Sequence, residues 1–231
     1  YVKIRENFYL FSMLPSYESR WFFRSCPPPL MEWFEYKGWR FGAPGNPARA
    51  DFYLPIPSDK GLGFKLREGR LEAKQLLAGI GEHPFPPFKA KGKVEHWIKW
   101  SFELKEADEL ARQIIREKQY DWIEVKKERL GFTYHFQQEG KVTEVPIHTV
   151  IPEGCQVELT QIHVFGKAYY TFGLEAFSHA GHLEENFRHG AEVFFSTLAE
   201  WQNGKAIAEL RLPAQASMGY PEFLSCLFYA L

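Results

Sequence analysis

The chain of 231 residues is long enough to bury a sizeable core, and its 45% hydrophobic, 17% aromatic and 25% charged residues are ordinary for one folded globular unit. Its formal net charge of −1 provides no overall field to attract nucleic acid or a membrane surface, so neither is expected as a partner. Its apolar runs are shorter than the roughly 18 residues that span a bilayer, so we expect no membrane-spanning helix.

The cysteines and the N-terminal residues indicate a reducing compartment. Cys26, Cys155 and Cys226 are spread along the chain without CxxC spacing, which predicts free thiols and not a disulfide framework or a zinc knuckle. The first residues lack the charged-then-apolar pattern of a signal peptide. We therefore expect a single cytoplasmic domain over residues 1–231, with a homodimer left open as its oligomeric state.

The first part of the chain predicts mainly strands. Residues 1–12 alternate loosely and predict a strand, residues 30–36 predict a short helix, and the Gly/Pro-rich residues 42–47 predict a loop. From residue 49 the alternation becomes sharper. RADFYLPI and the following LGFKLREGRLEAKQLL predict three strands, with a hairpin turn at residues 68–69.

The middle of the chain continues this pattern. Residues 93–104 alternate with period two and predict a strand, whereas residues 107–118 predict a helix with apolar residues on one face. Strands resume over residues 121–137, with a turn expected at Leu130–Gly131, and again over residues 141–147.

The last third holds two more strands and two helices. Residues 155–165 and 167–177 predict strands joined by a tight turn at Gly166. Residues 182–202 form a long amphipathic helix, whose apolar stripe is typical of contact with a core. A final helix is expected to begin near Ser217, which could cap it.

Many short strands with few helices between them favour an α+β fold in which an antiparallel sheet curls into a barrel with flanking helices. The motifs GxGxxG and GxxxxGK[ST] are missing from the sequence, which disfavours a Rossmann or P-loop nucleotide site.

Period-two alternation places charged residues on one face of several predicted strands. Lys65 and Arg67 share a face, as do Glu72 and Lys74 on the next strand. The pattern recurs in four further places: Arg49 and Asp51, Lys127 and Arg129, Glu158 and Thr160, and Thr171 with Glu175. A polar strand face usually lies in water. Here, however, amphipathic helices could cover the apolar faces from outside, which would turn the charged faces inward.

The charged set suits a phosphate-rich anion. Arg and Lys bind phosphate oxygens, and a few carboxylates can hold a hard divalent cation. One strand fits less well, because Lys127 and Arg129 share their face with Ile123 and Val125 unless a bulge intervenes.

Several of these segments resemble, in order, strands of the CYTH or triphosphate tunnel metalloenzyme superfamily: RADFYL, GFKLREGRLEAK, the KxR of EVKKERL, and VELT followed by GLEAF. SMGYPEFL resembles the C-terminal helix of that superfamily, which often begins with a Ser-Tyr motif, and the resemblance covers most of residues 49–229. It implies an eight-stranded barrel whose basic interior holds a triphosphate, with Mg²⁺ or Mn²⁺ on glutamates.

Carried over by position, the resemblance assigns roles to individual side chains. The residues expected to contact phosphate are Arg49, Lys65, Arg67, Lys74, Lys127 and Arg129, with Arg211 as a further basic group. The residues expected on the metal side are Glu158 and Glu175, with Glu72 as an additional carboxylate of the interior.

The sequence departs from the superfamily at its defining N-terminal ExExK strand. The first residues read VKIRENFYL, with Lys3, Arg5 and Glu6 where alternating acids are expected. Loss of those carboxylates would weaken metal binding and hydrolysis, so three functions stay open. They are metal-dependent hydrolysis of a triphosphate, binding of a polyanion without catalysis, and protein interaction through the aromatic-rich residues 17–41.

Overall fold

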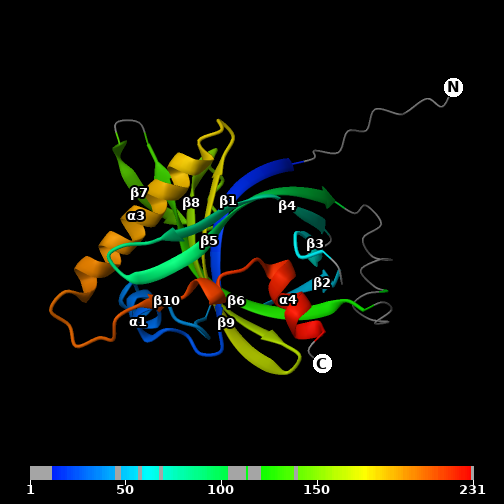
Figure 1. Ribbon diagram of the computed structural model, residues 1–231, viewed down its shortest axis with the longest axis horizontal. Helices are drawn as coiled ribbons and strands as arrows, with labels where there is room; N and C mark the ends of the chain where they lie inside the picture. The colour runs from blue at the N-terminus through cyan, green and yellow to red at the C-terminus, as the bar shows by residue number, and fades with distance from the viewer. Residues whose placement is uncertain are drawn as a thin grey trace.

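The structure is a computed structural model, and it describes residues 12–44, 48–56, 59–67, 70–103, 113, 121–137 and 140–229. Eight antiparallel strands close a barrel in the order β1-β9-β8-β6-β2-β3-β4-β5, with β5 pairing back onto β1 (Figure 1). These strands are β1 (Ser12–Phe23), β2 (Arg49–Leu54), β3 (Leu62–Arg67), β4 (Arg70–Pro84), β5 (Lys89–Glu103), β6 (Ile123–Phe136), β8 (Glu153–Val164) and β9 (Lys167–Ser178). The fold is therefore the α+β, eight-stranded antiparallel barrel that was expected.

Short strands and helices flank the closed barrel. Strand β7 (Val142–Pro146) pairs with β6, and β10 (Arg211–Leu212) pairs with β5 in parallel. The helices are α1 (Pro28–Tyr36), α3 (Leu183–Gln202) and α4 (Tyr220–Phe228). Of the helices that the structure describes, none combines the length and the apolar character needed to span a membrane.

The main apolar core lies outside the barrel wall. Helix α3 packs on β8 and β9, where outward-pointing residues such as Leu159 of β8 and Phe172 of β9 are fully buried. Phe194 of α3 lies 5.0 Å from Phe172, measured between ring centroids. Because α3 covers the apolar outer faces of β8 and β9, the polar faces of these strands must point into the barrel.

Several element predictions are confirmed. Helix α1 matches the helix expected over residues 30–36, and α3 matches the helix over residues 182–202. The turn between β8 and β9 is made by Phe165 and Gly166, which both have positive φ. All three cysteines are free.

Other predictions fall on residues outside those described. These are the strand over residues 1–12 apart from its last residue, the turn at residues 68–69, and the helix over residues 107–118 apart from Gln113. Strand β1 itself was not predicted.

The turn expected at Leu130–Gly131 is wrong, because β6 runs without interruption through both residues. Gly131 pairs with Glu158 of β8. A methyl group on Gly131 would lie 2.5 Å from the carbonyl oxygen of Val157 and 2.9 Å from Cδ1 of Ile147. Glycine is therefore needed at this position for close packing and not for a turn.

The cap expected at Ser217 is also wrong. Helix α4 begins at Tyr220, and Gly219 occupies the N-cap position. The Ser217 hydroxyl instead accepts a hydrogen bond of 2.9 Å from the backbone N–H of Lys93, which ties the segment before α4 to β5.

Candidate functional site

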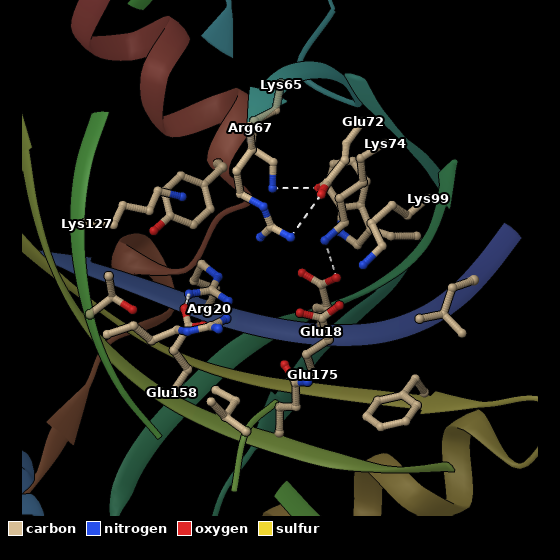
Figure 2. A pocket seen from close by; sticks show the side chains of 18 of the residues that line it. Glu18, Arg20, Lys65, Arg67, Glu72, Lys74, Lys99, Lys127, Glu158 and Glu175 are labelled. Atoms are coloured by element: carbon tan, nitrogen blue, oxygen red, sulfur yellow. Dashed lines mark hydrogen bonds and ion pairs between the residues drawn. The ribbon is translucent and has the colours of Figure 1, made fainter. Parts of the chain in front are cut away.

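The barrel encloses a cavity of about 480 Å³ into which many charged side chains point (Figure 2). Each of the eight barrel strands contributes at least one of them. Among the described residues that line the cavity, eight are Lys or Arg and four are Glu. They are Glu18, Arg20, Arg49, Lys65, Arg67, Glu72, Lys74, Lys99, Lys127, Arg129, Glu158 and Glu175. This set includes all nine residues that the sequence predicted for phosphate and metal contacts.

Glu72 on β4 is held by the two cations of β3. Its carboxylate lies 2.6 Å from Nζ of Lys65 and 3.3 Å from Nη2 of Arg67. Burial alone would raise the pKa of Glu72, but Lys65 and Arg67 outweigh this effect and lower it to about 2. The carboxylate is therefore fully ionised at neutral pH.

Glu158 on β8 joins two arginines across the cavity. Its oxygens lie 2.9 Å from Nη1 of Arg20 and 3.1 Å from Nη1 of Arg129. Burial opposes ionisation of Glu158, but these arginines hold its pKa well below the usual range. Gly173 of β9 leaves room for Arg20, because a methyl group there would lie 2.7 Å from the guanidinium carbon.

Two carboxylates meet at the centre of the cavity. Glu18 on β1 pairs in register with Glu175 on β9, and Lys74 donates a hydrogen bond to Glu18 (Figure 2). Burial and then the charge of Glu18 raise the pKa of Glu175. Burial opposes ionisation of Glu18, but Lys74 and Arg20 outweigh it and lower the pKa of that carboxyl. Glu175 is thus the carboxylate in most need of a further proton or cation.

This geometry bears on the predicted metal ligands. Glu72 and Glu158 are each bonded to two cationic side chains, whereas Glu175 lies beside Glu18. Within the described part of the chain, three or more His, Cys, Asp or Glu side chains nowhere gather as a metal site would require. Metal binding by Glu72, Glu158 and Glu175 stays a prediction.

Lys127 lies deep in the cavity among aromatic rings. Its Nζ is 3.2 Å from Oδ2 of Asp51 and 3.7 Å from the ring centroid of Tyr220, and it donates a hydrogen bond to the hydroxyl of Tyr53. Burial lowers the pKa of Lys127 to about 7, against the opposing effect of Asp51. Asp51 is fully buried, and its pKa is lowered because Lys127, Lys65 and Arg49 outweigh the cost of burial.

The mixed face expected on β6 is present, and no bulge resolves it. The pairings of β6 with β2 and β8 continue without a register shift. Ile123 and Val125 therefore share the inward face with Lys127, and they join an apolar cluster with Ile162 and with Phe223 of α4. The inward face thus changes from apolar to charged along the strand.

The loop between β7 and β8, residues 147–151, also lines the cavity. Strand β7 pairs with β6 on the edge that β2 also uses, whereas β8 pairs with the opposite edge. The connection over residues 147–151 must therefore cross β6, and it does so on the inward side, over Gly131. His148 of this loop lies 3.4 Å from Nη2 of Arg129.

Sequence reasoning missed three charged cavity residues and misplaced one. Glu18, Arg20 and Lys99 line the cavity, and the alternation Ser16, Glu18, Arg20 in SYESR was a readable signal for the first two. The acidic strand sought among the first nine residues lies outside the described part, but β1 supplies Glu18 and Arg20 from the chain just after it. Arg211 is not a cavity residue, since its side chain is 71% exposed beside Glu209.

Comparisons with known proteins add no family assignment. No protein-family model matches the chain, and no curated protein matches it significantly.

Proposed function

We propose that the barrel interior binds a phosphate-rich anion, such as a triphosphate, a polyphosphate or the phosphate chain of a nucleotide. The observation that carries the proposal is the charge inside the barrel: eight Lys and Arg side chains line the cavity against four Glu side chains. Asp51, buried behind Lys127, does not remove this excess. Charges of one sign held in a partly enclosed space interact more strongly with an anion than the same charges in water.

The kinds of cation also favour phosphate. Arg67 and Arg129 are each partly exposed and are held in place by a glutamate, so their guanidinium groups are positioned before any ligand arrives. Arginine binds phosphate through two parallel hydrogen bonds, and preorganisation of this kind lowers the cost of binding. The resemblance of the strand motifs to the CYTH superfamily points to the same class of ligand.

Metal-dependent hydrolysis is the second candidate, because Glu18 and Glu175 form a carboxylate pair next to these cations. Mg²⁺ or Mn²⁺ on this pair would neutralise charge on the phosphate oxygens and assist attack by water. Release of phosphate from tripolyphosphate or ATP with either metal, lost in Glu175→Gln, would support hydrolysis. Without release under any metal, the protein is a binding module.

Protein interaction through residues 17–41 stays a prediction. Of the aromatic side chains of this segment, Trp21, Trp33 and Phe34 belong to the core, whereas Tyr36 is 68% exposed.

A matched pair of lysine variants tests anion binding. Lys99 points into the cavity, whereas Lys126 points outward from β6 with a side chain 64% exposed. Both Lys→Met substitutions change the net charge equally. We expect calorimetry with tripolyphosphate to give a dissociation constant about tenfold or more higher for Lys99→Met, since one charged hydrogen bond is worth about 1.5–3 kcal/mol. Lys126→Met should bind like the unchanged protein. Equal affinities for the two variants, or no binding at all, would refute the proposal.

A further inference from the structure

The barrel interior is closed at one end by apolar side chains on the inward faces of its strands. Val125 and Ile162 are fully buried, and Phe22, Tyr169 and Ile123 are between 3% and 7% exposed. They form one cluster with residues of α4. On β1 the inward face changes from charged to apolar between Arg20 and Phe22, which are successive inward-facing residues of the strand.

Helix α4 and the residues before it fill the space that these side chains leave. Phe223 stacks on Phe22, with the ring centroids 3.9 Å apart and the planes 11° from parallel. The edge of Tyr169 meets Phe223 at 5.3 Å. In Figure 1, α4 lies within the arc formed by β2, β3 and β4.

Two glycines allow α4 and the residues just before it to pack closely against the barrel wall. A methyl group on Gly63 of β3 would lie 2.9 Å from Cγ of Pro221, and one on Gly219 would lie 2.8 Å from Cζ2 of Trp97. Gly63, Gly219 and Pro221 all line the cavity. The segment therefore sits inside the barrel, in close contact with β3 and β5, and forms the floor of the cavity.

A floor of this kind decides how a phosphate chain can enter. A polymer bound along an internal stretch needs two openings, one for each direction of the chain. The closed end offers aliphatic and aromatic groups, and burying phosphate oxygens against them without hydrogen bonds would be costly. Lys127 and Arg20 are the cations next to the floor. A terminal phosphate carries more negative charge than an internal one because of its second ionisation, near pH 6.

From this arrangement, and resting on the proposed function, we infer that the cavity receives its ligand end first and recognises an unsubstituted terminal phosphate. The ligand class is a linear oligophosphate, or a nucleoside oligophosphate whose nucleoside remains toward the mouth. Phosphate chains substituted at both ends are excluded.

Ligands that differ only at their ends test the inference with the unaltered chain. Calorimetry would compare tripolyphosphate and ATP, which have free ends, with diadenosine tetraphosphate, which carries a nucleoside at each end. We expect the doubly substituted ligand to bind at least about 30-fold more weakly than ATP, because phosphate oxygens or a nucleoside forced against the floor would lose hydrogen bonds to water. Linear polyphosphates of two defined lengths should each saturate at no more than two protein molecules per chain, one for each end.

The outcomes separate this inference from the proposed function. Diadenosine tetraphosphate that binds as tightly as ATP would overturn end recognition while leaving anion binding intact. The number of protein molecules bound per polyphosphate chain could instead rise with chain length. If it did, and if Lys99→Met reduced that number, end recognition would be overturned while anion binding would stand. Failure of tripolyphosphate and ATP to bind would overturn both.

Discussion

At the scale of single residues, three of the four interior glutamates are each paired with at least one cation, whereas Glu175 lies beside Glu18. Glu72 lies between Lys65 and Arg67, and Glu158 lies between two arginines. Removing one partner of such a group leaves a buried charge without compensation, which is costly even where the intact pair contributes little. The carboxylates thus hold the cations in position for an anion.

The lowered pKa of Glu72 predicts a stability change in acid. Because the pKa falls from 4.5 to about 2 on folding, ionised Glu72 stabilises the protein at pH values above about 4.5, and this contribution is lost as the pH falls toward 2. We expect Glu72→Gln to lower the free energy of unfolding by up to about 3 kcal/mol near neutral pH, and by much less below about pH 3.

Urea denaturation at several pH values would measure this difference. Glu124→Gln is the matched control, since Glu124 lies on β6 with a side chain 47% exposed. A constant difference between Glu72→Gln and the unchanged protein across the acid range would contradict the assigned ion pairs.

At the scale of elements, β6 organises the site. Its inward face supplies apolar Ile123 and Val125 to the closed end, then Lys127 and Arg129 to the cavity, and finally Gly131 where the loop over residues 147–151 crosses. The absence of a side chain at Gly131 allows the connection from β7 to β8 to pass over the inner surface of the wall.

Substitution of glycines in strands tests this role. In Gly131→Ala the new methyl group would overlap the Val157 carbonyl and Ile147, so we expect a loss of about 1–3 kcal/mol in the free energy of unfolding. Gly79→Ala on β4 is the control, because a methyl group there meets nothing within 4 Å. Chemical denaturation should leave Gly79→Ala within about 0.5 kcal/mol of the unchanged protein. Equal effects at both positions would argue against the crossing.

At the scale of the whole molecule, an excess of cations is enclosed by a closed wall whose stability comes from apolar packing outside it. Helix α3 packs on the outer faces of β1, β8 and β9, and α4 closes one end of the barrel. The total charge of −1 conceals this excess, because the cavity is lined by more cations than anions while the rest of the chain carries the balancing negative charge.

Mutual repulsion of the interior cations predicts a trade-off between stability and binding. In the absence of an anion, Lys99→Met should unfold at a temperature about 1–4 °C higher than the unchanged protein, although it binds tripolyphosphate more weakly. Lys126→Met on the outer surface should leave the unfolding temperature nearly unchanged. Thermal denaturation with and without tripolyphosphate measures both effects, and a Lys99→Met protein less stable than the unchanged protein would contradict the repulsion.

Alternation along the strands was enough to decide which side chains share a face, because successive residues of a strand point to opposite sides whatever the strand packs against. That is why all nine predicted contact residues line one cavity. Strand β1 escaped prediction because Pro15 within it argues against a strand, although Ser16, Glu18 and Arg20 alternate on one face after it. Gly131 was misassigned because a glycine required for close contact resembles a turn glycine in sequence.

Only the tertiary structure decided which face of each strand lies inside, which carboxylate meets which cation, and which end of the barrel is closed. These features depend on strand register and on contacts between residues far apart in the chain, such as Arg20 with Glu158 and Phe22 with Phe223. Local periodicity carries no information about such contacts, because they form only when the barrel closes and the helices settle on its wall.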